Sequence, residues 1–131
     1  MPGYPAVGAP EIDDEHAAFD SMLRRLGATV EQKDAQSAAN LLGAVLVRAA
    51  GHFASEERLM LQIRFLHMAR HTAAHRQFIA EARNIHKELC DAGLSPEVAT
   101  WITWAPRWFN AHVETEDLPL GEALIAARAG R

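Results

Sequence analysis

Apolar side chains recur three and four residues apart in four separate segments of the chain, and this spacing restricts the fold more than any other feature. Residues with this spacing lie on one face of an α-helix. The expected inward faces are His16, Phe19, Leu23, Leu26 and Val30; Leu41, Val45, Ala49, His52, Glu56, Leu59 and Ile63; His71, His75, Phe78, Ala82, Ile85 and Leu89; and Val98, Trp101, Ala105, Trp108 and His112. No segment alternates as a strand would. Four amphipathic helices with short connections predict an all-α, up-down-up-down antiparallel four-helix bundle.

Polar residues and prolines indicate where these helices begin and end. An extended arm, residues 1–11, precedes the first helix, which Asp13 or Asp14 can cap. Asp34 can cap the second helix, and Ser95 with its following proline begins the fourth. Pro106 is expected to kink the fourth helix. A last short helix is expected over residues 121–128.

Composition excludes several classes of function. The chain has 131 residues and a formal charge of -4, so it fits one domain and lacks the basic face that nucleic acid requires. A single cysteine, Cys90, leaves no internal disulfide or thiolate cluster, and we expect it to be a buried or half-buried helical residue. No apolar run approaches a membrane span, and no secretory signal is recognisable. We therefore expect a cytoplasmic protein with no membrane or nucleic-acid partner.

Histidines and carboxylates coincide with the apolar stripes. His52 and Glu56 are four residues apart, as are His71 and His75. Four residues turn a helix by about 400°, which leaves the two side chains on one face roughly 6 Å apart. His16 adds an inward histidine from the first helix. Such groups are costly in a core unless they are paired or bind metal.

His112 and Asp117 are five residues apart, an offset of about 140° on a regular helix. Both reach one site only if the helix ends or bulges between them. Pro119 favours an ending, because proline disfavours helix at the residue before it.

One inward histidine is more often a hydrogen-bonded core residue than a ligand, but two in-phase pairs favour a metal site. Imidazole and carboxylate donors without sulfur suit iron, manganese or zinc. Seven donors exceed what one tetrahedral zinc uses, whereas two metals bridged by two carboxylates use all seven. Ferritin-like di-iron proteins carry Glu-x-x-His pairs, and no histidine here has a glutamate three residues before it.

The order and spacing of these residues resemble the bacterial hemerythrins over nearly the whole chain. The matching segments are IDDEH with His16, HFASEE with His52 and Glu56, HTAAH with His71 and His75, and HVETED with His112 and Asp117. The resemblance implies one hemerythrin-like domain over residues 1–131, with an arm at 1–11 and the bundle and C-terminal tail at 12–131. It also implies two iron ions joined by an oxo or hydroxo bridge, by Glu56 and by Asp117.

By the same resemblance, His71, His75 and His112 hold one iron, and His16 and His52 hold the other. The second iron then has one open position for dioxygen. This implies reversible oxygen binding for storage, delivery or sensing, and not an enzyme. The alternative left open is a di-iron redox enzyme acting on peroxide, nitric oxide or a small oxidisable substrate, with weak oxidase or peroxidase activity. A sensory role would need another chain as partner, and the sequence does not identify one.

Four aromatic residues are expected to wall an oxygen pocket, although ordinary core packing explains them equally well: Phe53, Phe78, Trp108 and Phe109. The family usually has leucine where Phe109 follows Trp108, so the bulkier ring is expected to alter access. Arg64, Phe65 and Leu66 stand where the family commonly has Gly-Tyr-Pro. We interpret Glu57, His67 and His86 as surface residues.

Overall fold

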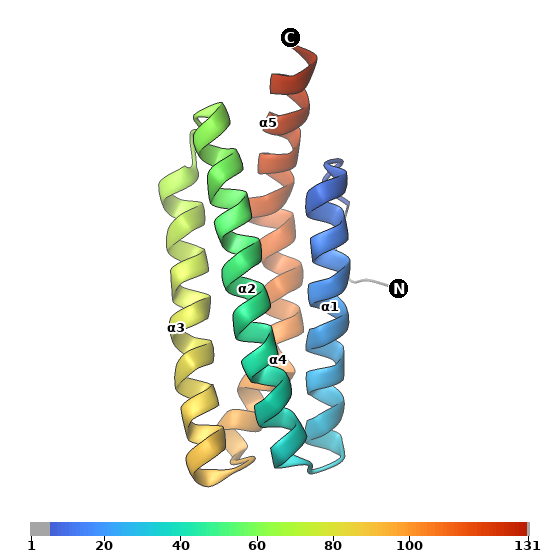
Figure 1. The fold of residues 1–131 in the computed structure, drawn as a ribbon, viewed down its shortest axis with the longest axis vertical. Coiled ribbons are helices and arrows are strands. Elements are labelled where there is room, and N and C mark those ends of the chain that lie inside the picture. The colour runs from blue at the N-terminus through green and yellow to red at the C-terminus, as the bar shows by residue number, and fades with distance from the viewer. Residues whose placement is uncertain (1–5, 131) are drawn as a thin grey trace.

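The computed structural model describes residues 6–130, and this part of the chain is helical without a strand. The helices are α1 (Pro10–Glu31), α2 (Ala35–Ile63), α3 (Met68–Ala92), α4 (Pro96–His112), the π-helix η1 (Val113–Asp117) and α5 (Leu118–Ala129). Successive helices from α1 to α4 run in opposite directions, and α5 continues α4 beyond the other helices (Figure 1). The predicted antiparallel four-helix bundle is confirmed. None of the described helices is long and apolar enough to cross a membrane.

The first helix begins earlier than we expected. Its N-cap is Ala9, so the prediction that Asp13 or Asp14 caps it is wrong. The Asp13 carboxylate instead accepts hydrogen bonds from the backbone N–H groups of Val7 (2.8 Å) and Gly8 (3.2 Å). Val7 is buried and packs so closely on Gly121 that a Cβ there would clash. The described end of the arm is therefore fastened to both α1 and α5.

Side-chain caps and a left-handed residue define the other helix ends. Asp34 accepts a hydrogen bond from the Ser37 N–H (3.0 Å), and Ser95 accepts one from the Val98 N–H (3.2 Å), as predicted. At the end of α2, Arg64 has φ 54°, and the Phe65 N–H donates to the Met60 carbonyl at 2.9 Å. This pattern is a Schellman motif, which usually has glycine at the left-handed position.

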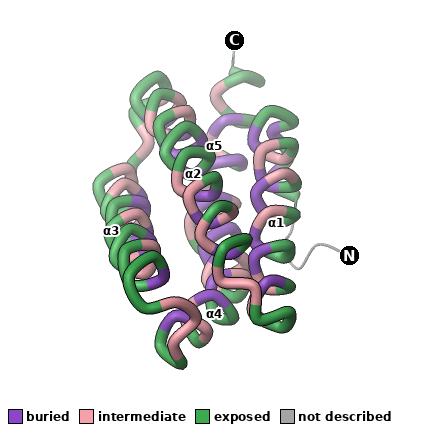
Figure 2. The backbone as a smooth tube through the Cα atoms, turned by 60° about the horizontal axis from the view of Figure 1, so that its bottom comes forward, coloured by how far each residue is buried: buried purple, intermediate pink, exposed green. Residues whose placement is uncertain are grey.

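The buried faces of the helices point toward a shared core (Figure 2). The buried faces differ from the predicted inward faces on two helices. On α2, Leu42 and Met60 are fully buried, whereas Leu41 and Leu59 are only partly buried. On α4, the core positions are these: Val98, Ile102, Ala105, Phe109 and His112. Trp101 and Trp108 are half-buried on the flank of α4 instead.

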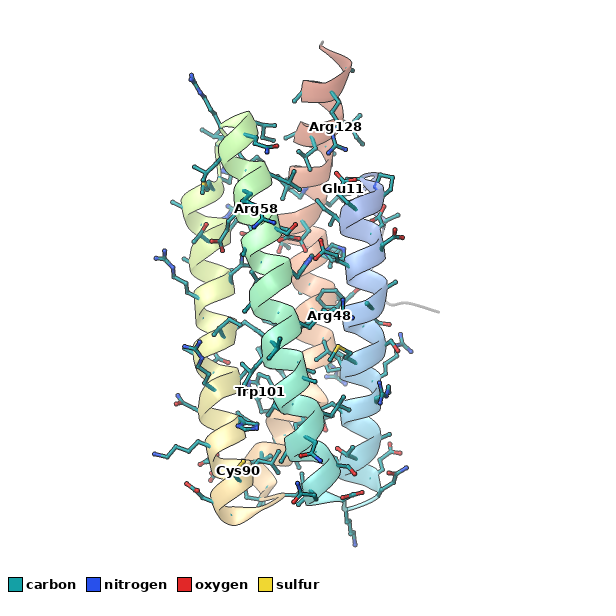
Figure 3. The ribbon with its side chains drawn as sticks, in the orientation of Figure 1. Glu11, Arg48, Arg58, Cys90, Trp101 and Arg128 are labelled. Carbon is teal, nitrogen blue, oxygen red and sulfur yellow. The ribbon has the colours of Figure 1, made fainter. Side chains whose placement is uncertain are left out.

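The end of α4 differs from the expectation. The α-helix runs through Pro106 to His112, passes into the π turn, and continues as α5 through Pro119. The predicted ending near Pro119 is wrong, because the five-residue offset is accommodated by a bulge in a helix that continues. Cys90 is exposed and not buried as expected, and it lies near the lower end of the bundle in Figure 3.

Candidate metal centre

Seven side chains from all four bundle helices and η1 converge in the core, and each belongs to a residue at most 4% exposed. They are the seven residues selected from the sequence: His16, His52, Glu56, His71, His75, His112 and Asp117. Their donor atoms form two groups, with Glu56 and Asp117 in both. Three histidines complete one group and two complete the other.

The two oxygens of Glu56 face different histidines. Its Oε1 lies 3.2 Å from His71 Nε2 and 3.0 Å from His75 Nε2. Its Oε2 lies 3.0 Å from His52 Nε2 and 3.5 Å from His16 Nε2. One carboxylate therefore spans both groups.

Asp117 divides its oxygens in the same way. Oδ1 lies 2.8 Å from His71 Nε2 and 3.2 Å from His112 Nε2, whereas Oδ2 lies 2.9 Å from His16 Nε2. The arrangement can thus offer two metal positions, each facing one oxygen of each carboxylate.

The π turn positions Asp117 beside His112. An i to i+5 hydrogen-bonding pattern has a wider turn than the α-helix, so residues five apart come to the same side. η1 spans exactly the residues after His112 up to Asp117. Without this bulge, the carboxylate would be rotated away from the core.

Several donor atoms of the cluster are placed as the ligands of a buried cation would be. Nε2 of His52, His75 and His112 and both oxygens of Asp117 are buried, and the short distances between them do not have the geometry of hydrogen bonds. Buried polar atoms of this kind carry a desolvation cost unless something pairs with them. Imidazole and carboxylate donors fit iron, so the residues present suit a non-haem metal.

The cluster also perturbs proton affinities. Burial opposes protonation of His16 and His71, but the Asp117 and Glu56 carboxylates outweigh it and raise the pKa of each histidine to about 9. Burial likewise opposes ionisation of Glu56, yet the surrounding histidines lower its pKa well below the usual value. His112, His16 and His71 lower the pKa of Asp117, against the opposing effects of burial and of the Glu56 charge. The metal-free core therefore holds protons that a cation would displace.

Two glutamates outside the seven orient ligand rings, and neither was identified from the sequence. Glu57 Oε2 lies 3.1 Å from His75 Nδ1, and Glu15 Oε2 lies 3.2 Å from His52 Nδ1. Our interpretation of Glu57 as a solvated surface residue is wrong. A carboxylate on the outer nitrogen fixes the tautomer that turns Nε2 toward a metal. Each glutamate is adjacent in sequence to a predicted ligand, which was the available signal.

Aromatic rings cover both groups of histidines. Phe53 stacks on His75 with centroids 3.9 Å apart, and Trp108 stacks on His112 at 4.8 Å. Phe109 lies 5.4 Å from His16 on the two-histidine side. Phe78 packs behind Trp108 at 4.3 Å. The ring of Phe19, which we expect from the sequence only on the core face of the first helix, lies 4.9 Å from Phe109.

Comparisons with known proteins agree with this arrangement. A family model described as the hemerythrin HHE cation binding domain matches residues 7–124. A myohemerythrin of Riftia pachyptila is 25% identical over 111 residues, covering 85% of this chain and 81% of that protein. A wild-type hemerythrin crystal structure superposes with a TM-score of 0.79 at 20% identity over 90% of each chain. A leucine-to-phenylalanine mutant structure also gives 0.79, at 21% identity over 90% and 89%.

Fold and cluster together define a helical-bundle protein with a buried non-haem metal site. The family match covers most of the chain, and the chain therefore belongs to the hemerythrin HHE cation binding domain family.

Proposed function

We propose that this protein binds dioxygen reversibly at a carboxylate-bridged di-iron centre. His71, His75 and His112 would hold one iron, His16 and His52 the other, and Glu56 and Asp117 would bridge them. The observation that carries this proposal is the divided pairing of the Glu56 oxygens, with Oε1 at 3.0 Å from His75 and Oε2 at 3.0 Å from His52.

The unequal number of histidines supports an oxygen site on the His16 and His52 side. With three histidines and three bridges, including a solvent-derived oxo or hydroxo group, one iron would be six-coordinate. The other would have two histidines and the same bridges, and so one open position. The iron pair would supply the two electrons that reduce dioxygen. The family description, a cation binding domain, and the buried cluster of histidines and carboxylates both support a non-haem iron site.

The chain's own residues would make the binding reversible by excluding water. The rings of Phe109 and Phe19 are 1% and 0% exposed and lie beside the two-histidine group. An apolar wall slows the entry of protons that would release reduced oxygen and leave the site oxidised. Glu15, at 30% side-chain exposure, holds His52 from the outside of this wall.

The experiment is an optical oxygen cycle on iron-loaded protein. Reduced protein should be nearly colourless, gain a visible absorption band with oxygen, and lose it on deoxygenation over repeated cycles. Irreversible bleaching or no band in protein that holds iron would refute oxygen carriage.

A second function, oxidation of a small substrate or reduction of peroxide or nitric oxide, is favoured by the position of Phe109. Its large ring lies against His16, where the family usually has leucine, and so narrows the space beside the open position. Rapid autoxidation combined with catalytic turnover of one of these substrates would support this function over the carrier.

A further inference from the structure

Three tryptophans form a chain of ring contacts from the metal centre to the surface. Trp108 stacks on His112 with centroids 4.8 Å apart and planes 16° apart. Trp104 follows at 6.5 Å from Trp108, and Trp101 at 6.1 Å from Trp104. The three residues are spaced three and four apart on one flank of α4, outside the core positions of that helix. Trp101 and Trp108 also pack on Phe78 of the core, with ring centroids 5.6 and 4.3 Å away, whereas Trp104 is exposed and links the two rings outside the core.

The outer end of this chain opens into a groove between α3 and α4. Trp104 is 38% exposed, and with Trp101, Ile85 and Thr100 it lines a hollow of about 550 Å³ that also contains Glu81 and Glu97. Trp101 Nε1 donates a hydrogen bond to Glu81 Oε1 at 3.3 Å. Trp101 lies in the lower half of the bundle in Figure 3, toward the end where Cys90 is found.

We propose that Trp108, Trp104 and Trp101 form an electron relay between this groove and the metal centre, used when hydrogen peroxide oxidises the centre, and that the groove takes a small phenolic electron donor. Indole is among the side chains most readily oxidised by one electron, and electron transfer is fastest between rings in contact. The proposal rests on the iron site proposed above, but it is independent of reversible oxygen binding.

The electron balance explains when the relay is needed. Reduction of one peroxide to two waters takes two electrons and two protons. Bound iron in its reduced state would supply both electrons. With iron already oxidised, Trp108 would give up the electrons one at a time and would be refilled from Trp104 and Trp101. An oxidised indole loses its N–H proton. Glu81 can accept the proton that Trp101 loses, because it already accepts the hydrogen bond from Trp101 Nε1. Two phenols then return one electron and one proton each, leaving two phenoxyl radicals.

The groove has the chemistry to hold such a donor. Flat indole faces and Ile85 favour an aromatic ring, and the Glu81 and Glu97 carboxylates can accept a hydrogen bond from a phenol hydroxyl. The same carboxylates disfavour anionic donors.

The test uses the iron-loaded protein and two variants at the innermost ring. W108F keeps an aromatic ring on His112 but is redox-inert, whereas W108Y keeps a ring that can be oxidised. Iron content is measured first. A wild-type protein that binds no iron would overturn the iron site and the relay with it, whereas iron-loaded protein without tryptophan oxidation would overturn the relay alone. The diferric proteins then receive stoichiometric peroxide, with indole radicals followed by electron paramagnetic resonance and oxidised tryptophans located by peptide mass spectrometry.

Wild type and W108Y should show oxidised Trp101 and Trp104, and W108F should fall to the level of the iron-free protein. Phenol oxidation should fall in parallel. Equal oxidation of Trp101 and Trp104 in W108F, equal oxidation without iron, or no tryptophan oxidation in iron-loaded wild type would overturn the relay.

W104F provides a second test at a residue that is already partly exposed. This variant should lower the yield of oxidised Trp101, and the oxidation should then be found at Trp108. An unchanged yield at Trp101 would contradict the order of transfer.

Discussion

His112 and Asp117 are five residues apart in one continuous helix, and the π turn η1 brings them to the same side. Asp117 Oδ1 lies 3.2 Å from His112 Nε2. A π turn in an otherwise α-helical segment is often found at functional sites. Here the π turn directs the Asp117 carboxylate into the cluster of histidines. In a regular α-helix the same side chain would point away from the cluster.

Replacing either shared carboxylate should lower metal content. In D117A or E56A, both metal positions lose one oxygen donor, so we expect fewer than two irons per chain by elemental analysis. E116A is a matched control, because Glu116 belongs to neither donor group and pairs with Arg70 (3.3 Å), so its loss should leave the iron content unchanged. Full retention of two irons in D117A and E56A would contradict their assignment as bridges.

Removing an outer carboxylate should weaken metal binding without abolishing it. E57Q and E15Q lose the charge that orients His75 and His52, and such changes commonly cost about 10–100-fold in metal affinity. Competition with a chelator measures the effect. E114Q, at an exposed position of η1, is the control. Unchanged affinity in E57Q and E15Q would show that the two contacts do not support the ligands.

The metal-free protein should lose stability from neutral to alkaline pH. His16 and His71 have a folded pKa of about 9 against an ordinary value of 6.5, so their contribution is complete below 6.5 and is lost as the pH rises through 9. Each histidine taken alone contributes about 3 kcal/mol. Glu56 and Asp117 have lowered pKa values, so their contribution is lost in acid, below their ordinary values of 4.5 and 3.8.

Chemical unfolding of the apoprotein, followed by circular dichroism across pH, tests this dependence. The free energy of unfolding should be highest between about pH 4.5 and 6.5 and should decline toward pH 9. H67Q, at an exposed histidine, should keep the same profile, and H16Q should flatten its alkaline side. A wild-type apoprotein whose stability rises between pH 7 and 9 would contradict the pairing of these groups.

Replacing Arg64 with glycine should stabilise the fold. Arg64 has φ 54°, a left-handed conformation that costs a residue with a side chain about 1 kcal/mol or more. R64G should therefore raise the free energy of unfolding by about 1 kcal/mol. R64A separates backbone strain from loss of the arginine side chain, and it should give no such gain. Equal effects of R64G and R64A would exclude the conformational explanation.

Shortening Phe109 should open the two-histidine side of the centre. F109L removes part of a ring that is 1% exposed, at a cost of about 1–2 kcal/mol in stability. The iron-loaded variant should exchange oxygen faster, because the removed atoms lie beside His16. Stopped-flow spectroscopy measures the rates, and unchanged oxygen entry and release would place the access route elsewhere.

Much of the fold was predictable because it depends on helical periodicity. Apolar residues that recur three and four positions apart identify four amphipathic helices. His52 with Glu56, and His71 with His75, have the same spacing and lie on these apolar faces, so their side chains are predicted to point inward. The prediction of a helix end beyond Asp117 failed, because a five-residue offset fits either a helix end or a bulge. Pro119 favours an end only locally, and the packed helix on both sides of η1 outweighs that preference.

Contacts between helices were harder to predict. Glu57 is one residue from Glu56 and points about 100° away from it, so its pairing with His75 depends on where α3 packs. The same holds for Trp101 and Trp108, whose half-buried positions follow from the rotation of α4 in the bundle. Ala9 has no capping side chain, and the role of Asp13 appears only once residues 6–9 are placed.

We propose that a pair of irons is joined through Glu56 and Asp117. Iron quantitation combined with a Mössbauer spectrum of the oxidised protein tests it most directly. We expect two irons per chain and a diamagnetic ground state, because ferric ions that share bridging ligands couple their spins. A single iron per chain, or ferric ions that are magnetically isolated, would contradict it.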